Sequence, residues 1–279
     1  MTVRGTAAGL RREAIGFAGI VERNTYLIRR FAWWELAWFI YTVANTLTIV
    51  FIAKGVEQQG VTAHINELTI VLLIGAVVWS YLGLLFEIVT ETVAWERWEG
   101  TIEYTFMAPI SRPAHLLGMG AFAVGYGVIR TVFLFGVVAL SLGVAFPHAD
   151  FGSAVVVLAV SSVSFVGIGT MTAVLPLISP EKGTQLGFIA QGLLLVVSGV
   201  YYPVSVLPQW MQWVSVISPA TYTLEGCRKA ILDDASVASL WSDIWPLLVI
   251  GAVAVPLGLW VFNRGERYAK RHGRLKRSG

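Results

Sequence analysis

Apolar segments long enough to cross a lipid bilayer recur along this chain, separated by short charged or polar stretches. A helix needs about 20 mostly apolar residues to cross the hydrocarbon core, where backbone N–H and C=O groups must be satisfied within the protein. Of the 279 residues, 56% are apolar and 13% are charged, which is far from the composition of a soluble domain. We therefore predict an all-α polytopic membrane protein, with residues 1–279 forming a single transmembrane domain.

Six segments are predicted to span the membrane. They are residues 32–53, 68–89, 116–146, 153–178, 186–206 and 244–263. Tryptophan and tyrosine side chains near the start of the first segment form an aromatic belt of the kind found at membrane–water interfaces. Residues 8–31 precede this segment, and apolar side chains recur there at spacings of three and four, which predicts an amphipathic helix lying in the interface. The arginines in this region predict that it is not a cleavable signal peptide.

Basic residues are distributed unevenly between the two sides that six spans define. The N-terminal arm carries six arginines and residues 264–279 carry seven lysines and arginines, whereas the opposite side has three basic residues, Lys54, Arg228 and Lys229. The positive-inside rule therefore predicts a multi-pass protein of the inner or plasma membrane with both termini cytoplasmic. Because residues 264–279 follow a span directly, they are predicted to be a basic cytoplasmic tail that contacts anionic lipid, and no nucleic-acid partner is expected.

Residues 95–113 carry unusual polar chemistry between two apolar segments. Four carboxylates lie in this loop or just before it: Glu91, Glu96, Glu99 and Glu103. The cost of charge in hydrocarbon places the loop in water, on the cytoplasmic side. Gly100 is predicted to end the preceding helix, and Thr101 to cap a new helix by accepting a hydrogen bond from a backbone N–H. Pro109 ends this second helix, so we predict a short cytoplasmic helix over residues 99–109.

This short helix is predicted to have an apolar face and an acidic flank. Ile102 and Phe106 are four residues apart and therefore share one face. Glu103 lies in the first turn, where the helix dipole favours negative charge. A helix of this kind suits docking into a groove on a soluble partner, and the alternative is a solvated acidic face.

Two blocks of residues resemble a known family, the membrane subunits of type-2 ABC exporters, particularly the small members that export drugs or lipids. The first block is Glu99-Gly100-Thr101-Ile102-Glu103, followed by Ala108-Pro109-Ile110-Ser111-Arg112. The second block resembles the family's fifth-span exit and outer loop, and it comprises Ser198 to Ser205, Leu207-Pro208, Trp210, Ser218 to Tyr222 and Arg228. The resemblance covers nearly the whole chain.

The resemblance implies six spans, a coupling helix that contacts a separate ATPase, and two membrane subunits per transporter. On this chain it implies an ATPase-coupling interface made of Glu96, Glu99, Gly100, Thr101, Ile102, Glu103, Phe106 and Pro109. The implied partners are a cytoplasmic ABC ATPase in two copies and a second permease subunit, expected to be identical. The ATPase is also an alternative contact for the helix at 8–31, beside the membrane surface.

Arg130 is a charge well inside a predicted span, so its side chain must face protein or water. It is a candidate for lining a translocation path, or for pairing with Glu87 or with a polar group on another span. The structural alternative is that the guanidinium satisfies backbone carbonyls.

The outer segment at 203–243 is unusually apolar and predicts two short helices that are re-entrant or pack over the spans. Tyr201, Tyr202 and Trp210 are candidates for a path or gate in this region. The alternative for each is an aromatic side chain at the membrane interface.

The chain carries no motif for ATP hydrolysis or for covalent catalysis. It has no G-x-x-x-x-G-K-[ST] phosphate loop, and we find no paired carboxylates within a predicted span. One cysteine and four scattered histidines provide no metal-ligand spacing. We therefore expect no enzyme activity, cofactor or metal in this chain, and expect ATP and magnesium to bind the partner ATPase.

The predicted function is that of the permease subunit of an ATP-binding-cassette exporter, which moves a hydrophobic or amphipathic, drug-like or lipid-like substrate outward. Export of glycan–lipid or polysaccharide conjugates is the alternative within the same family. From other classes, the alternatives are a membrane scaffold or sensor that docks a cytoplasmic partner, and a lipid-modifying enzyme. The enzyme would need catalytic groups at membrane depth, which we do not find in the sequence.

Overall fold

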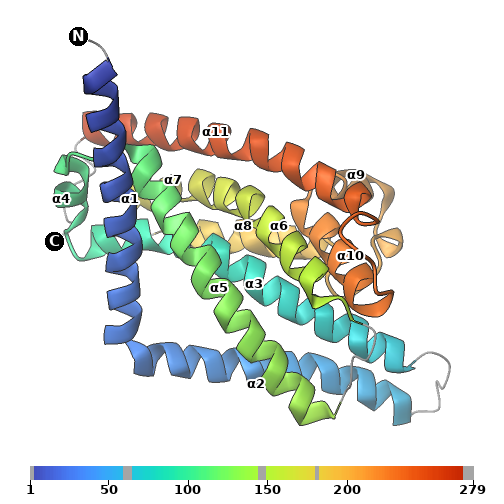
Figure 1. The fold of residues 1–279 in the computed structure, drawn as a ribbon. Coiled ribbons are helices and arrows are strands. Elements are labelled where there is room, and N and C mark those ends of the chain that lie inside the picture. The colour runs from blue at the N-terminus through green and yellow to red at the C-terminus, as the bar shows by residue number, and fades with distance from the viewer. Residues whose placement is uncertain (1–2, 59–64, 144–148, 180–181, 273–279) are drawn as a thin grey trace.

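The computed structural model describes residues 3–58, 65–143, 149–179 and 182–272. These residues are mostly helical and contain no strand, so the predicted all-α class is confirmed. Five segments among them are long and apolar enough to cross a membrane. They are formed by α2 (Ala32–Gln58), α3 (Ile65–Trp98), α5 (Arg112–Leu142), α6 (Phe151–Thr172) with α7 (Val174–Ile178), and α11 (Trp241–Arg271). Figure 1 shows these helices running between the two ends of one bundle.

The predicted span at 186–206 is wrong as a single helix. α8 (Gly183–Val197) has 15 residues, which rise about 22 Å and fall short of a hydrocarbon core of about 30 Å. Beyond it, Gly199 turns the chain with a φ of 68°, a conformation that side chains disfavour. Three short helices follow: η1 (Val204–Val206), α9 (Gln209–Ser215) and α10 (Pro219–Leu232). Two of them, α9 and α10, occupy the segment for which two short helices were predicted.

Several other predicted boundaries also shift. α3 continues past the predicted end at residue 89 to Trp98, and the break between α6 and α7 falls at Ala173. The short helix predicted at 99–109 is α4 (Ile102–Met107), which is six residues long. α11 continues to Arg271, so the first part of the predicted tail at 264–279 is helical. The end of the predicted span at 116–146 and the tail beyond His272 lie outside the described residues.

α1 (Val3–Arg30) crosses the ends of the spanning helices at the same end of the bundle as α4 (Figure 1). It packs chiefly against α5 and joins α2 through a bend at Phe31. A helix that lies across a bundle of spans is oriented to lie along the membrane surface. This direction agrees with the interfacial helix predicted at 8–31.

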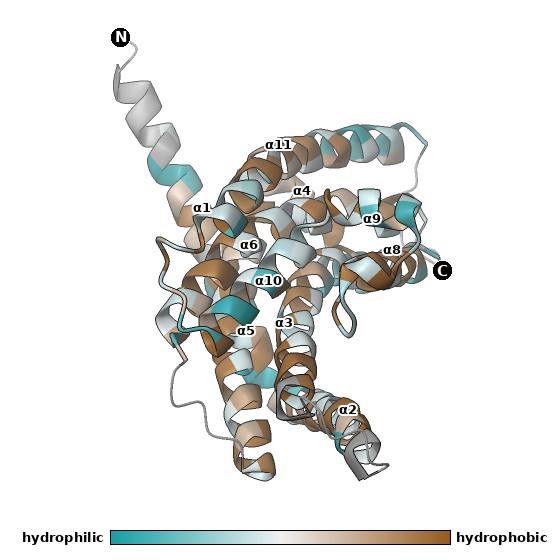
Figure 2. Cartoon of the chain, turned by 90° about the vertical axis from the view of Figure 1, so that its right-hand side faces the viewer, coloured by the Kyte–Doolittle hydropathy of each residue, from teal (hydrophilic) through white to brown (hydrophobic). Residues whose placement is uncertain are grey.

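Large apolar side chains point away from the protein along α2, α5 and α11. Examples are Ile40, Phe51, Phe133, Leu140 and Val253, each more than half exposed. Figure 2 shows that hydrophobic residues predominate along α2 and α5. Exposed apolar surface of this extent is unusual for a protein in water but suits contact with lipid, in keeping with a multi-pass membrane protein.

The most extensive packing joins α6 to α11. Two glycines let their backbones approach closely, because a Cβ atom added at Gly258 would lie 2.5 Å from the carbonyl oxygen of Gly167. Small residues serve this purpose at helix contacts in membranes, where water does not drive helices together. α3 fills the centre of the bundle, where Leu73, Leu82 and Leu85 are fully buried.

We predict that Gly258→Leu will destabilise the protein by about 1 to 3 kcal/mol, because the new side chain must push α11 away from α6. Thermal unfolding in detergent will measure the loss. Gly125→Leu is the matched control, because no atom lies within 4 Å of a Cβ added at Gly125 on α5. Equal melting of Gly258→Leu and the wild type would show that α6 and α11 are not held at this separation.

Candidate functional site

Gly100 ends α3 as predicted, but Thr101 does not cap α4 in the predicted way. Gly100 has a φ of 77°, which ends α3. Thr101 occupies the N-cap position of α4, yet its hydroxyl accepts no capping hydrogen bond. Instead, the hydroxyl donates to the carbonyl of Glu96 at 3.2 Å. The predicted cap is therefore wrong in its bonding, because Thr101 has an α-type backbone (φ −85°, ψ −11°) whereas a capping residue is usually extended.

The apolar face of α4 is directed into the bundle. Ile102 is 1% exposed and packs in a cluster with Val93 and Leu116, while Phe106 is partly buried against the same cluster. The face available to a partner is formed by other side chains, namely Glu99, Glu103, Tyr104, Met107 and Pro109. We call these five residues the coupling face. Tyr104 and Met107 were not predicted, although their positions opposite Ile102 and Phe106 on a helix would have identified them.

α4 is tied to the C-terminal part of α11 through Arg112. The guanidinium donates to the carbonyl of Phe106 at 2.8 Å and to Glu266 of α11 at 2.9 Å. It also lies over the ring of Phe106, 4.3 Å from the centroid. Lys270 completes the cluster with an ion pair to Glu266 at 2.7 Å. Arg112, on the first turn of α5, therefore joins α4 to α11 by charged hydrogen bonds.

α1 is tied to the loop after α4. The hydroxyl and the backbone N–H of Ser111 both donate to the carboxylate of Glu13, at 2.6 and 3.0 Å. These two hydrogen bonds hold the pKa of Glu13 below its ordinary value. The Ser111 hydroxyl also caps α5 by accepting from the backbone N–H of Ala114.

Glu96, which was predicted to contact the ATPase, is instead buried within the chain. It is 1% exposed and forms an ion pair with Arg23 of α1. His115 of α5 is fully buried, and its Nε2 atom lies 3.6 Å from the same carboxylate oxygen. Glu96 therefore joins three helices below the coupling face.

Arg97 ties the last turn of α3 to α7. It is buried, and its guanidinium donates to the carbonyls of Pro176, at 3.1 Å, and Leu177. Because α7 packs against α8, this contact links the end of α3, just before the coupling face, to α8 through α7.

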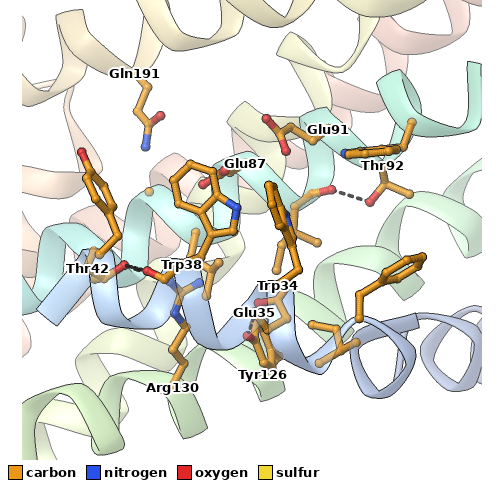
Figure 3. A pocket seen from close by; sticks show the side chains of 18 of the residues that line it. Trp34, Glu35, Trp38, Thr42, Glu87, Glu91, Thr92, Tyr126, Arg130 and Gln191 are labelled. Atoms are coloured by element: carbon orange, nitrogen blue, oxygen red, sulfur yellow. Dashed lines mark hydrogen bonds between the residues drawn. The ribbon is translucent and has the colours of Figure 1, made fainter. Parts of the chain in front are cut away.

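A cavity of about 1100 Å³ opens between α2, α3, α5 and α8, with the end of α1 at one side. Figure 3 shows Trp34, Glu35 and Trp38 entering it from α2, and Glu87 and Glu91 from α3. The other labelled side chains are Gln191 of α8, Tyr126 and Arg130 of α5, Thr42 of α2 and Thr92 of α3. The cavity therefore combines aromatic rings with charged groups at the depth of the spans.

Arg130 lines this cavity, as its predicted role in a translocation path requires. Its guanidinium donates to the hydroxyl of Thr42 on α2 at 2.9 Å. Of the two predicted partners, Glu87 or a polar group on another span, the structure therefore shows the second, and that group is Thr42. No ion pair joins it to Glu87 in the part of the chain that the structure describes. Glu35 has a separate partner, because Tyr126 donates to it at 2.6 Å.

The three aromatic candidates at the other end of the bundle do not share one environment. Tyr201 lines the cavity. Tyr202 donates to the carbonyl of Val196, and Trp210 is 64% exposed on α9, so neither lines the cavity. The turn that carries both tyrosines is held by Arg228, which donates to the carbonyl of Val200 at 2.8 Å.

Glu87 and Glu91 lie in the membrane-spanning part of α3, contrary to two expectations from the sequence. Glu91 was placed in the aqueous loop, and no paired carboxylates were expected within a span. Because α3 runs to Trp98, both Glu87 and Glu91 lie inside the long apolar helix, one turn apart. The i, i+4 spacing of the two carboxylates was visible in the sequence. Because the predicted span ended at Val89, however, Glu91 was not expected to lie within the membrane.

Comparison with known proteins identifies a family and relatives that match parts of this chain. The family model of the ABC-2 type transporter matches residues 20–232. A probable multidrug ABC transporter permease of Escherichia coli K12, YbhR, is 25% identical over 178 residues, which is 62% of this chain and 46% of that protein. The linearmycin resistance permease protein LnrN of Bacillus subtilis 168 is 24% identical over 143 residues, covering 49% of this chain and 37% of that protein. The chain thus spans less than half the length of these curated relatives.

We predict that Glu96→Gln will lower stability by about 2 kcal/mol, less than for a fully buried pair because Arg23 is partly exposed. The same change should loosen α1, which thermal unfolding and limited proteolysis at the N-terminal end will detect. Glu99→Gln is the control for loss of a charge, because Glu99 is exposed one turn away. Wild-type melting and protease resistance of Glu96→Gln would contradict the role of Glu96 in joining the helices.

Proposed function

Because the chain belongs to the ABC-2 type transporter family, we propose that it is the permease subunit of an exporter that moves hydrophobic or amphipathic, drug-like or lipid-like molecules outward across the inner or plasma membrane. The observation that carries this proposal is the cavity of about 1100 Å³ between α2, α3 and α8. Ligand sites are typically concave, largely apolar and equipped with a few polar groups. The names of the two relatives, a multidrug permease and an antibiotic resistance permease, support a substrate of this class.

Energy for export comes from a separate cytoplasmic ATPase, which binds ATP and magnesium and acts in two copies. The ATPase contacts the coupling face, where Glu99 and Glu103 supply charge and Tyr104 and Met107 supply apolar surface. Charge complementarity then calls for basic residues around the groove that receives α4. The basic distribution of the chain supports a cytoplasmic position for this face and for both termini.

Movement passes from the coupling face to the cavity through the contacts that brace α4. Arg112 and Glu266 carry it to α5 and α11, and Arg97 carries it to α7 and so to α8. α5 and α8 both line the cavity, so their displacement changes its shape and its affinity for substrate. ATP drives export if it favours the conformation that releases substrate outward.

A second copy of the chain completes the transporter. The cavity has α2 on one side and α8 on another, and both helices expose many apolar residues, including Ile40 and Leu193. A second permease packed against these helices would enclose the substrate between two cavities. The aromatic rings would also serve glycan–lipid conjugates, which are the second candidate substrate class.

We predict that Glu103→Lys will reduce ATP-dependent export by about tenfold or more, because it places a positive charge against the basic groove expected on the ATPase. The measurement is transport and ATP hydrolysis by the complex purified from its native membrane and reconstituted in vesicles. Asp233→Lys is the matched control, since it makes the same charge change at an exposed position after α10, at the other end of the bundle.

Loss of export with a normally folded permease supports the proposal. Full export by Glu103→Lys would contradict the assignment of the coupling face. Purification of the permease from its native membrane without any nucleotide-hydrolysing subunit would contradict the proposed function as a whole.

A further inference from the structure

Two carboxylates of α3 face the cavity at a depth where charge is costly. Glu91 and Glu87 lie about 10 and 17 Å along the helix from its end at Trp98, inside a segment apolar enough to span the membrane. Figure 3 shows both side chains reaching the cavity from α3, whereas Trp34 and Trp38 reach it from α2. Ionisable residues within a span are rare and usually mark a pathway for a substrate or an ion.

Neither carboxylate forms an ion pair with a cation among the described residues. Within the described ranges, Glu87 and Glu91 make no hydrogen bond and no ion pair, unlike Glu35, which accepts from Tyr126. Arg130 donates to Thr42 and is not within ion-pair distance of either group. Three carboxylates therefore face one guanidinium in the middle of the cavity.

A further acidic oxygen is available where the cavity meets α1. Glu96 lines the cavity and is 1% exposed. Its Oε1 atom pairs with Arg23, but its Oε2 atom has no hydrogen-bond partner among the described residues. The described lining of the cavity therefore carries more carboxyl groups than guanidinium groups, an excess that favours a cation.

Helix α2 supplies aromatic surface to the cavity. The rings of Trp34 and Trp38 meet edge to face with centroids 6.3 Å apart, and the two residues are 62% and 47% exposed. Trp38 contacts Tyr41 in the same way at 5.7 Å. The exposed rings can cover an apolar body, and an indole face attracts a cation when water is excluded.

We propose that this cavity selects amphiphiles that carry a positive charge, such as organic cations and hydrophobic amines in their protonated form. Glu87 and Glu91 take the charge, and Trp34 and Trp38 take the apolar body. A neutral amphiphile leaves the two carboxylates unmatched, and an anionic one adds repulsion, so both bind more weakly. This inference rests on the proposed function and specifies its substrate class.

Binding of two ions of the same shape and opposite charge tests the proposal. The permease is placed in lipid nanodiscs, and equilibrium binding of tetraphenylphosphonium and tetraphenylborate is measured against empty nanodiscs. The wild type should bind the phosphonium at least about tenfold more tightly than the borate, because the unmatched carboxylates attract one ion and repel the other. Glu87→Gln/Glu91→Gln should lose about tenfold or more in phosphonium affinity while borate binding stays equal or improves.

Glu22→Gln is the matched control, because it removes a carboxylate from an exposed position on α1 that does not line the cavity. Its binding of both ions should equal that of the wild type. Retained borate binding by the double variant reports that the cavity is folded, and the single variant Glu91→Gln should lose part of the phosphonium affinity.

Equal wild-type binding of the two ions, or unchanged phosphonium binding by the double variant, would overturn the proposal. Absence of phosphonium binding would also overturn it. ATP-dependent export of a neutral compound by a complex that ignores the phosphonium would remove the charge preference and leave the exporter assignment standing.

Discussion

The cost of placing charged and polar groups in hydrocarbon determines how this chain is arranged. Helices such as α2 and α5 meet this constraint by pairing their backbone groups internally and presenting apolar side chains outward. Charged side chains of the spans are instead found at helix ends or at the cavity. Where a charge is buried, as at Arg97 and Glu96, it is bound to carbonyls or to an opposite charge on another helix. Polar contacts in this protein therefore mark the places where helices are held together.

These polar contacts are concentrated around the coupling face. Glu13 connects α1 to the loop after α4, Arg112 connects α4 to α11, and Arg97 connects α3 to α7. α4 alone has six residues, too few to be stable as an isolated helix, so its position depends on these contacts. The same contacts provide a physical route between a partner and the cavity. Glu13 and Arg112 join α4 or the loop after it to longer helices, and Arg97 joins the end of α3 to α7.

The sequence predicted the class, the membrane-spanning character and the short helix after Gly100, because these follow from apolar length and from the conformational freedom of glycine. It did not predict that α8 stops at Val197 and that the chain then folds back into α10. Apolar composition continues through Val206, and hydropathy does not distinguish a spanning helix from a shorter one followed by apolar turns. The candidate site was only partly predictable for a related reason. Arg130 was identified by its isolation in a span, whereas Glu87 and Glu91 were obscured by their proximity to a charged loop, and the partners of Glu96 depend on α1 and α5.

The most direct measurement of the central claim is the distance between α2 and α8 across the cavity while the ATPase works. Spin labels at Ile40 and Leu193, both exposed and on these two helices, report this distance in the reconstituted complex with Cys227 replaced by serine. We predict that ATP shifts the distance distribution and that Glu103→Lys abolishes the shift while leaving the nucleotide-free distribution unchanged. An α2–α8 distance that stays the same throughout ATP hydrolysis and export would contradict the account.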